Sequence, residues 1–125
     1  MSQYFNEEEM KCHCCRQLPE NGIDPKLYDV LDQIRIMIGK PLNINCAYRC
    51  PKHNAEVGGV LNSQHLFGTA ADIDAGDIGV DNLADIVEQV LSFFGIEGGI
   101  GKYWSQNFVH CDVAQDGVRR WNEND

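Results

Sequence analysis

The sequence contains no hydrophobic run long enough to cross a membrane, and its N-terminal segment is acidic rather than apolar. A membrane-spanning helix needs about 20 apolar residues in succession, and a secretory signal peptide needs an apolar stretch behind a basic start. Residues 1–9 instead read Met-Ser-Gln-Tyr-Phe-Asn-Glu-Glu-Glu. We therefore expect a chain that is synthesised in the cytoplasm without a signal peptide and that does not contact a membrane.

Basic residues are also scarce in this chain. It has 10 lysines and arginines against 19 aspartates and glutamates, which gives a formal net charge of -9 at pH 7. Binding to nucleic acid requires clustered cations that displace the counterions of the phosphates, and anionic membranes attract polybasic segments. Nucleic acid and membrane are therefore not expected as partners. The acidity itself identifies no partner, because net charge of either sign mainly keeps a protein soluble.

The length of 125 residues and the hydrophobic content of 43% suit one domain with one hydrophobic core. No repeat, low-complexity tract or linker divides the chain. We expect a single monomeric domain over residues 1–125, in which residues 1–22 form a cysteine-bearing lead-in.

Cysteine is more frequent than expected, with six residues. Three of them crowd together in the lead-in: Cys12, Cys14 and Cys15. Without a secretion signal, we expect reduced thiols rather than a disulfide framework. A second, small zinc site that uses these cysteines or His13 is an alternative. Against it, no second Cys/His pair at the usual spacing follows, since Cys46 and Cys50 are separated by three residues and flank a different motif.

Two long helices are predicted from capping signals and from apolar residues at three- and four-residue spacing. The first has Asp24 as its N-cap, a proline at its first position and Gly39 at its end. The second has Asp81 as its predicted N-cap and ends at Gly95. A short helix is predicted over residues 51–57.

Alternating apolar and polar residues predict strands over residues 42–47 and 69–74, followed by a hairpin of residues 98–103 and 107–113. Two long helices among short strands favour an α+β fold with a small antiparallel sheet. Trp121 is expected to cover the core near the C-terminus.

Two histidines and an aspartate are candidates for zinc ligands. His65 precedes Asp72 by seven residues, and His110 lies on a predicted strand further along the chain. Two imidazoles and one carboxylate leave a fourth position for water, which is the pattern of catalytic zinc sites. The bound ion would activate that water for amide hydrolysis. We therefore expect one Zn2+ ion at these residues, although spacing alone also allows structural or surface histidines.

Strand alternation assigns the faces of residues 108–113. One face carries His110 and Asp112, and the other carries Val109, Cys111 and Val113. Because the apolar set should face the core, His110 and Asp112 should face the site. Cys111 is therefore expected to point away from the metal.

The central part of the chain resembles a known family. The segment Asn45–Gly59 (NCAYRCPKHNAEVGG) leads into Ser63-x-His65-x-x-Gly68-x-Ala70-x-Asp72. Together these motifs are similar to the zinc D-alanyl-D-alanine carboxypeptidase and endopeptidase family, peptidoglycan peptidases that share a fold with the hedgehog signalling domain. The resemblance implies a fold of that hedgehog/DD-peptidase type.

The resemblance extends to both sides of these motifs, over about residues 4–121. His110-x-Asp112 resembles the closing motif of the family. The lead-in Tyr4-Phe5-x-x-x-Glu8, with Cys12, resembles a subgroup found in phage and bacterial cell-wall proteins.

The family implies roles for particular residues. His65, Asp72 and His110 would be the zinc ligands. Arg49 would contact a carboxylate or carbonyl group of the substrate stem peptide, because a guanidinium can bind such groups with two hydrogen bonds; a structural salt bridge is the alternative. Ser63 would steady the ligand loop or bind the substrate backbone, or it would only end the preceding turn.

One position departs from the family pattern. Several members carry Glu or Asp three residues before the last histidine ligand as the general base, and here that residue is Asn107. Asp112 is the first candidate for a replacement, and its alternative role is to accept the other N–H of a ligand histidine. Glu97, His53 and Glu56 are lesser candidates.

We thus expect a zinc-dependent hydrolase that cuts an amide bond in D-Ala-containing stem peptides or cross-links of peptidoglycan by metal-activated water. It would reach the cell wall after release or as part of a phage structure. A zinc-stabilised binding module of the same fold, without turnover, is the first alternative. A cysteine-based redox or structural-zinc protein is another, and it predicts low-pKa thiols at Cys12, Cys14 or Cys15.

Overall fold

The structure is a computed structural model that describes residues 2–59, 63–115 and 117–124. Its centre is a five-stranded sheet with the order β1-β2-β4-β3-β5. The strands are β1 (Asn43–Cys46), β2 (Ala70–Asp74), β3 (Gly99–Tyr103), β4 (Phe108–Asp112) and β5 (Arg119–Asn122). The four strands predicted from alternation are all present, and β3 and β4 form the predicted antiparallel hairpin.

The expectation of a wholly antiparallel sheet is wrong at one edge, because β5 runs parallel to β3. The chain leaves β4, passes the hairpin and returns along the outer side of β3. The segment Arg119–Asn122 shows no alternation of apolar and polar residues, so the sequence carried no strand signal there. The fold is nevertheless a mixture of helices and strands, as predicted.

The described residues form four α-helices and two 3-10 helices. The α-helices are α1 (Glu7–Met10), α2 (Pro25–Ile38), α3 (Pro51–Glu56) and α4 (Val80–Phe94), and the 3-10 helices are η1 (Gln64–Phe67) and η2 (Trp104–Gln106). Helix α2 follows its capping signals, since the Asp24 side chain accepts a hydrogen bond from the Lys26 amide and Gly39 adopts a left-handed φ of 67°. None of the helices in the described part of the chain is both long and apolar enough to span a bilayer.

Helix α4 begins two residues earlier than predicted, with Gly79 rather than Asp81 as its N-cap. Val80 is buried in the core, so the first helical turn starts there. Asp81 lies in that turn, and its carboxylate accepts a hydrogen bond from Trp104 Nε1 at 3.1 Å and pairs with Lys102 at 3.2 Å. The predicted cap thus serves to attach α4 to the β3–β4 hairpin.

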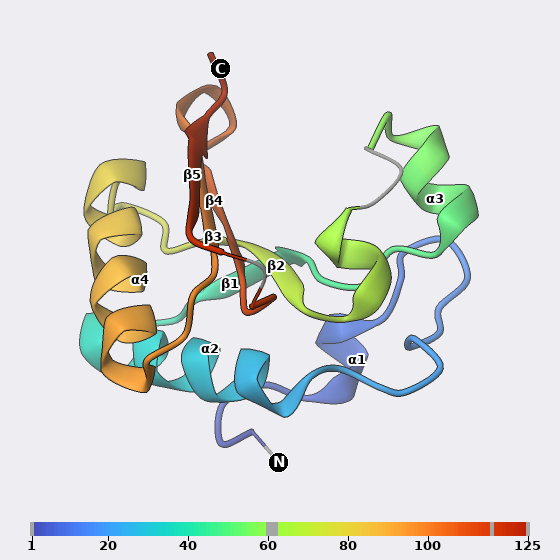
Figure 1. The fold of residues 1–125 in the computed structure, drawn as a ribbon, viewed down its shortest axis with the longest axis horizontal. Helices are drawn as coiled ribbons and strands as arrows, with labels where there is room; N and C mark the ends of the chain where they lie inside the picture. The colour runs from blue at the N-terminus through green and yellow to red at the C-terminus, as the bar shows by residue number, and fades with distance from the viewer. Residues whose placement is uncertain (1, 60–62, 116, 125) are drawn as a thin grey trace.

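The sheet separates a hydrophobic core from an open side. Helix α4 lies on one side of the strands, and α3 lies on the other, beyond η1 (Figure 1). Val109, Cys111 and Val113 belong to the buried core cluster, as the alternation of β4 predicts. His110 and Asp112 therefore lie on the opposite face of β4, and Cys111 points into the core.

The strand register brings two candidate ligands together. In the antiparallel pairing of β2 with β4, Asp72 lies directly opposite His110. On the other side of β2, Cys46 of β1 is the partner of Asp72. Directly opposed residues of an antiparallel pair point to the same face, so the sheet itself positions two of the three candidate ligands.

Candidate metal centre

His65 is placed by the short helix η1, which precedes β2. The side chain of Ser63 caps η1 by accepting a hydrogen bond from the His65 amide at 3.3 Å. Gly68 ends it in a left-handed conformation with φ 73°. A Cβ atom at Gly68 would meet the carbonyl oxygen of Gly22 at 2.9 Å, so both its conformation and its space favour glycine. The glycine of the sequence motif is thus required where the ligand loop turns into β2.

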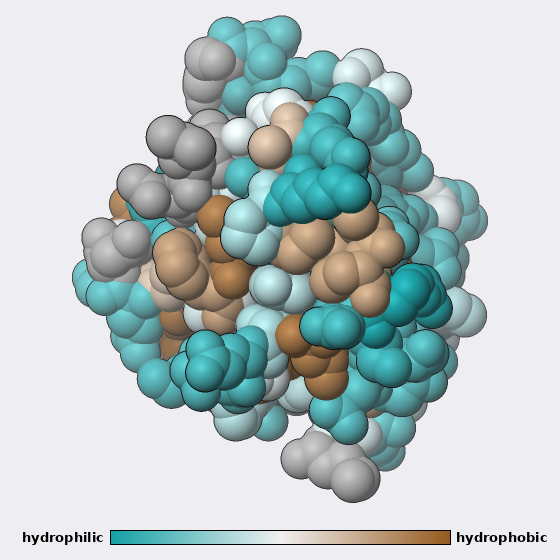
Figure 2. Space-filling view, turned by 90° about the vertical axis from the view of Figure 1, so that its right-hand side faces the viewer, coloured by the Kyte–Doolittle hydropathy of each residue, from teal (hydrophilic) through white to brown (hydrophobic). Residues whose placement is uncertain are grey.

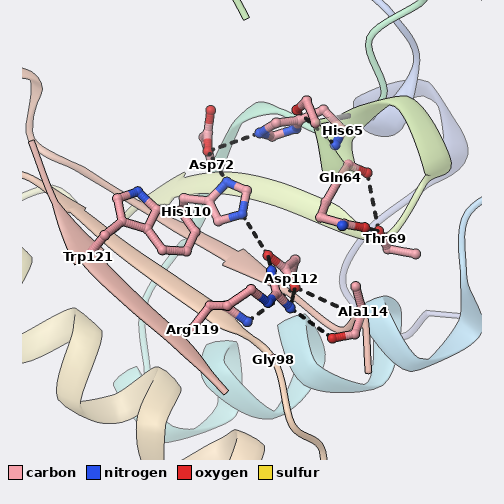
Figure 3. Close-up of polar contacts among 12 residues, drawn as sticks. Gln64, His65, Thr69, Asp72, Gly98, His110, Asp112, Ala114, Arg119 and Trp121 are labelled. Carbon is pink, nitrogen blue, oxygen red and sulfur yellow. Dashed lines mark hydrogen bonds and ion pairs between the residues drawn. The ribbon is translucent and has the colours of Figure 1, made fainter. Parts of the chain in front are cut away.

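The structure brings the three sequence-predicted ligands together (Figure 3). His65 Nε2 and His110 Nδ1 each lie 3.2 Å from the same oxygen of Asp72, Oδ1. The two imidazole rings are 5.1 Å apart between centroids and nearly perpendicular, at 79°. His65 is 2% exposed and His110 8% exposed. The centre is therefore compact, largely buried and built from two segments that are distant in sequence.

The outer nitrogen of each imidazole has a fixed partner. His65 Nδ1 lies 2.6 Å from the carbonyl oxygen of Ala47, to which it donates, because a carbonyl can only accept. His110 Nε2 donates to Asp112 Oδ2 at 2.9 Å. In neutral imidazoles, these bonds leave lone pairs on His65 Nε2 and His110 Nδ1, both facing the Asp72 carboxylate. Two imidazole nitrogens and the carboxylate that they both face are donors suited to a divalent cation. Outer partners of this kind are typical of metal-binding histidines.

Charge is concentrated at this centre. Burial raises the pKa of Asp72, but the two imidazoles outweigh this effect and lower it. Burial lowers the pKa of both histidines, yet the Asp72 carboxylate raises that of His65, and Asp112 together with Asp72 raises that of His110. The carboxylate and the two imidazoles thus each favour the charged form of the other.

Asp112 is the most enclosed carboxylate of the centre, with 0% exposure. It accepts hydrogen bonds from His110, from the Gly99 amide at 3.1 Å and from both terminal nitrogens of Arg119, at 3.0 and 2.7 Å. Burial raises the pKa of Asp112, whereas His110 and Arg119 lower it, to about 2 in the balance. Because the Asp112 carboxylate already accepts these hydrogen bonds and lies on the outer side of His110, it is poorly placed to take a proton from the attacking water. Its geometry favours orienting His110 over acting as a general base.

A cleft of about 880 Å³ opens in front of the centre. Arg49 lines it, and its Nη2 donates to Ser63 Oγ at 3.0 Å. Arg49 Nε is buried with no hydrogen-bond partner, and no described residue forms an ion pair with this guanidinium. The alternative of a structural salt bridge therefore has no support in the described part of the chain. The face that carries α3 mixes hydrophilic surface with small hydrophobic patches (Figure 2).

Trp121 lies in this cleft, so the expectation that it covers the core is wrong. Its ring centroid is 5.0 Å from that of His110, and its Nε1 donates to the hydroxyl of Tyr103 at 2.8 Å. Gly101, opposite Trp121 in the β3–β5 pair, makes room for the ring, because a Cβ there would lie 2.5 Å from it. Trp121 and Arg119 were not predicted as residues of the site, because β5 was not predicted. The glycines of β3 were the feature of the sequence that could have indicated a closely packed neighbour on that strand.

The cleft offers few replacements for the missing general base. Asn107 is exposed and adopts a left-handed φ of 54°, and its Nδ2 donates to the Gly76 carbonyl at 3.3 Å. Among the described residues that line the cleft, Asp72 and Asp112 are the carboxylates. The lesser candidates from the sequence do not line it: Glu97, His53 and Glu56.

Cys46 also lies near His65, at 4.0 Å between Sγ and Nδ1. That nitrogen is the one that donates to Ala47, so this contact lies on the outer side of the imidazole. Donor atoms of Cys46, His65 and Asp72 nevertheless lie within 4.8 Å of one another, so Cys46 is a further candidate ligand that the sequence did not indicate.

Comparison with known proteins finds peptidases. The family model described as peptidase M15 matches residues 3–112. The chain is 34% identical over 83 residues to the zinc D-Ala-D-Ala carboxypeptidase of Streptomyces albus G, which covers 66% of this chain and 31% of that protein. It is 30% identical over 129 residues to the peptidoglycan L,D-endopeptidase MepK of Escherichia coli K12, covering 94% of this chain and 67% of MepK. The chain thus spans about a third of the first relative and about two thirds of the second.

Proposed function

Because this chain belongs to the peptidase M15 family of zinc metallopeptidases, we propose that it hydrolyses an amide bond next to a D-amino acid, such as D-Ala, in the peptides of peptidoglycan. His65, Asp72 and His110 are the proposed ligands of one catalytic zinc ion. The observation that carries this proposal is the approach of His65 Nε2 and His110 Nδ1 to one oxygen of Asp72, each at 3.2 Å.

Zinc, when bound, supplies a Lewis acid that polarises the scissile carbonyl and makes water a better nucleophile near neutral pH. The chain's own residues prepare the site for it. Ala47 and Asp112 hold the outer N–H groups of the two histidines, so that His65 Nε2 and His110 Nδ1 stay available as ligands. Arg119 keeps Asp112 ionised and oriented toward His110.

Arg49 is the proposed anchor of the substrate. Its Nη2 is held by Ser63, which also caps the ligand helix η1, so the guanidinium has a fixed position relative to His65. Its buried Nε has no partner among the described residues, and a peptide carboxylate or carbonyl in the cleft would satisfy it. Ser63 thus connects the proposed anchor to the metal ligand.

The substrate class is proposed from the names of the relatives, one a D-Ala-D-Ala carboxypeptidase and the other a peptidoglycan L,D-endopeptidase. We further propose that residues 1–125 act as one monomeric domain of the hedgehog/DD-peptidase type. We propose the cell wall as its place of action, because the name of the second relative specifies peptidoglycan.

A non-catalytic zinc-binding module of the same fold is the second candidate, and Asn107 favours it. The described cleft offers no carboxylate free of both the ligand set and the Arg119 pair. A module of this kind would bind peptidoglycan peptides without cutting them.

Incubation of the purified protein with defined muropeptides, with and without a chelator, tests the proposal. Mass spectrometry should show a zinc-dependent product that disappears with the chelator and returns when zinc is restored. Binding of the same muropeptides without any product would instead support the non-catalytic module. The masses of the products identify the bond and distinguish carboxypeptidase from endopeptidase action.

A further inference from the structure

A second cluster of metal-binding side chains lies away from the cleft centre, where the lead-in meets α3. The sulfur atoms of Cys12, Cys15 and Cys50 all lie within 4.8 Å of one another. Cys12 and Cys15 come from the lead-in loop, and Cys50 is the N-cap residue of α3. The two segments are 35 or more residues apart in sequence, and the lead-in passes beside α3 (Figure 1).

The spacing of these residues is that of a zinc site. Cys12 and Cys15 form a Cys-x-x-Cys pair, and Cys50 and His53 form a Cys-x-x-His pair. The fold brings three of these four side chains together, the three sulfur ligands of a Cys₃His zinc site, and His53 is the candidate for the fourth ligand. The expectation that no second Cys/His pair at the usual spacing follows is therefore wrong.

We propose that Cys12, Cys15, Cys50 and His53 bind a second zinc ion with a structural role. His53 lies within the neighbouring group of Cys14, His53 and Glu56, whose donor atoms also lie within 4.8 Å of one another. The backbone amide of His53 donates to Cys50 Sγ at 3.4 Å, so the first turn of α3 holds this sulfur in place. Cys14 is the competing candidate for the fourth position.

Backbone amides surround the sulfur of Cys12 and favour its thiolate form, the form that binds metal. The Cys50 amide donates to it at 3.3 Å. Burial raises the pKa of Cys12, but the amides of Cys15, Cys50 and Cys14 lower it, to about 7 in the balance. The redox alternative expects low-pKa thiols at Cys12, Cys14 or Cys15. Only Cys12 has a lowered pKa, because burial and the neighbouring sulfur atoms of Cys50 and Cys12 raise the pKa of Cys14 and Cys15.

The proposed ion would fasten one wall of the cleft. Cys50 directly follows Arg49, which lines the cleft, and the amide of Tyr48 donates to the Met10 carbonyl at 3.1 Å. The lead-in and residues 47–50 are thus already joined by this backbone hydrogen bond and by the bond from the Cys50 amide to Cys12 Sγ. A zinc ion bound by Cys12, Cys15 and Cys50 would cross-link the two segments. It would thereby fix Arg49 relative to the catalytic ligands.

Zinc content of the full-length protein, purified under reducing conditions, tests the proposal. Elemental analysis should give two equivalents of zinc per chain for the wild type and one for Cys50→Ser. The control is Cys111→Ala, which removes a buried sulfur that lies on the core face of β4, opposite the His110 face, and should keep two. A thiol-binding mercurial should release one equivalent from the wild type and none from Cys50→Ser.

The outcome is separable from the catalytic proposal. His65→Ala should lose the equivalent that the mercurial does not release, while it keeps the thiol-bound one. A wild-type protein from which the mercurial releases no zinc, or that has disulfide-linked cysteines on mass analysis under these conditions, would overturn the second site and leave the first intact. His53→Ala should speed the loss of the thiol-bound equivalent to a chelator at least tenfold, and Cys14→Ser should not; the reverse result would remove His53 from the ligand set.

Discussion

At the scale of single residues, the centre is a chain of contacts in which each group fixes the next. Arg119 holds Asp112, Asp112 holds the outer nitrogen of His110, and the inner nitrogen of His110 faces Asp72. The sequence indicated the histidines and Asp72 through their spacing and the family resemblance, and Asp112 through strand alternation. The role of Arg119 could not be predicted, because its contact with Asp112 depends on the pairing of β5 with β3, for which the sequence has no local pattern.

Removal of a ligand should affect metal content and stability together. We expect His65→Ala to lose the zinc equivalent that resists the mercurial and to lower Tm, because an ion that binds only the folded state stabilises it. Elemental analysis and thermal unfolding with and without added zinc measure the two effects. Full retention of that equivalent by His65→Ala would contradict the ligand assignment.

Asp112 should matter to turnover without contacting the substrate. Asp112→Asn replaces one oxygen acceptor beside His110 Nε2, and loss of such an outer partner typically costs 10- to 100-fold, so we expect a decrease of about tenfold or more in kcat. The affinity for zinc should fall as well, whereas loss of a general base alone would leave it unchanged. Rates on muropeptides and zinc competition assays separate the two roles, and unchanged turnover would exclude both.

The pair between Arg119 and Asp112 should stabilise the fold far more than its neighbour on β5 does. Arg119→Met leaves a fully buried carboxylate without its cation, which should lower the free energy of unfolding by about 3 kcal/mol. Arg120→Met is the matched control, because Arg120 pairs at 2.6 Å with the exposed Glu88, and an exposed pair contributes about 1 kcal/mol or less. Urea unfolding of both variants gives the comparison, and equal losses would contradict this ranking.

At the scale of elements, the sequence predicted those whose ends carry local signals. Helix α2 starts and ends where Asp24 and Gly39 indicate, and the β3–β4 hairpin follows from alternation. Strand β5 was missed because its four residues include two arginines and no apolar alternation. It is stabilised by partners supplied from elsewhere, namely the β3 backbone, Asp112 and Tyr103. Long-range pairing of this kind cannot be recognised in a short window of sequence.

The fit between β3 and β5 predicts the effect of a single methyl group. Gly101→Ala would place a Cβ against the Trp121 ring, and overpacking of this kind costs about 1–3 kcal/mol. We expect reduced stability in urea and weaker zinc binding, since Trp121 packs against His110. Gly79→Ala, where an added Cβ meets nothing within 4 Å, is the control. A Gly101→Ala protein with wild-type stability and zinc affinity would show that the ring can move without consequence.

At the scale of the whole molecule, stability should depend on pH in opposite ways with and without zinc. In the zinc-free protein the pKa values of His65 and His110 are raised above 6.5. A raised folded-state pKa stabilises the fold below the unfolded value and loses that contribution as pH rises through the folded value. Zinc requires neutral imidazoles, so its own stabilisation grows as pH rises.

We therefore expect the difference in Tm between zinc-bound and zinc-free protein to widen from pH 5 to pH 8. Zinc affinity should fall on the order of a hundredfold per pH unit in the acidic range, because two imidazoles take up protons. Thermal unfolding and zinc competition across this range provide the measurement. An affinity that does not change between pH 5 and pH 7 would contradict ligation by two histidines.

The position of β5 bears on how much of the chain is needed. The family match ends at residue 112, and Arg119 and Trp121 come after it. A chain shortened after Val113 would retain every matched residue and all three ligands, yet Asp112 would lose its counterion and the sheet its outer edge. Such a truncation should bind zinc poorly despite a complete motif, so the smallest working unit extends past the boundary that sequence matching suggests.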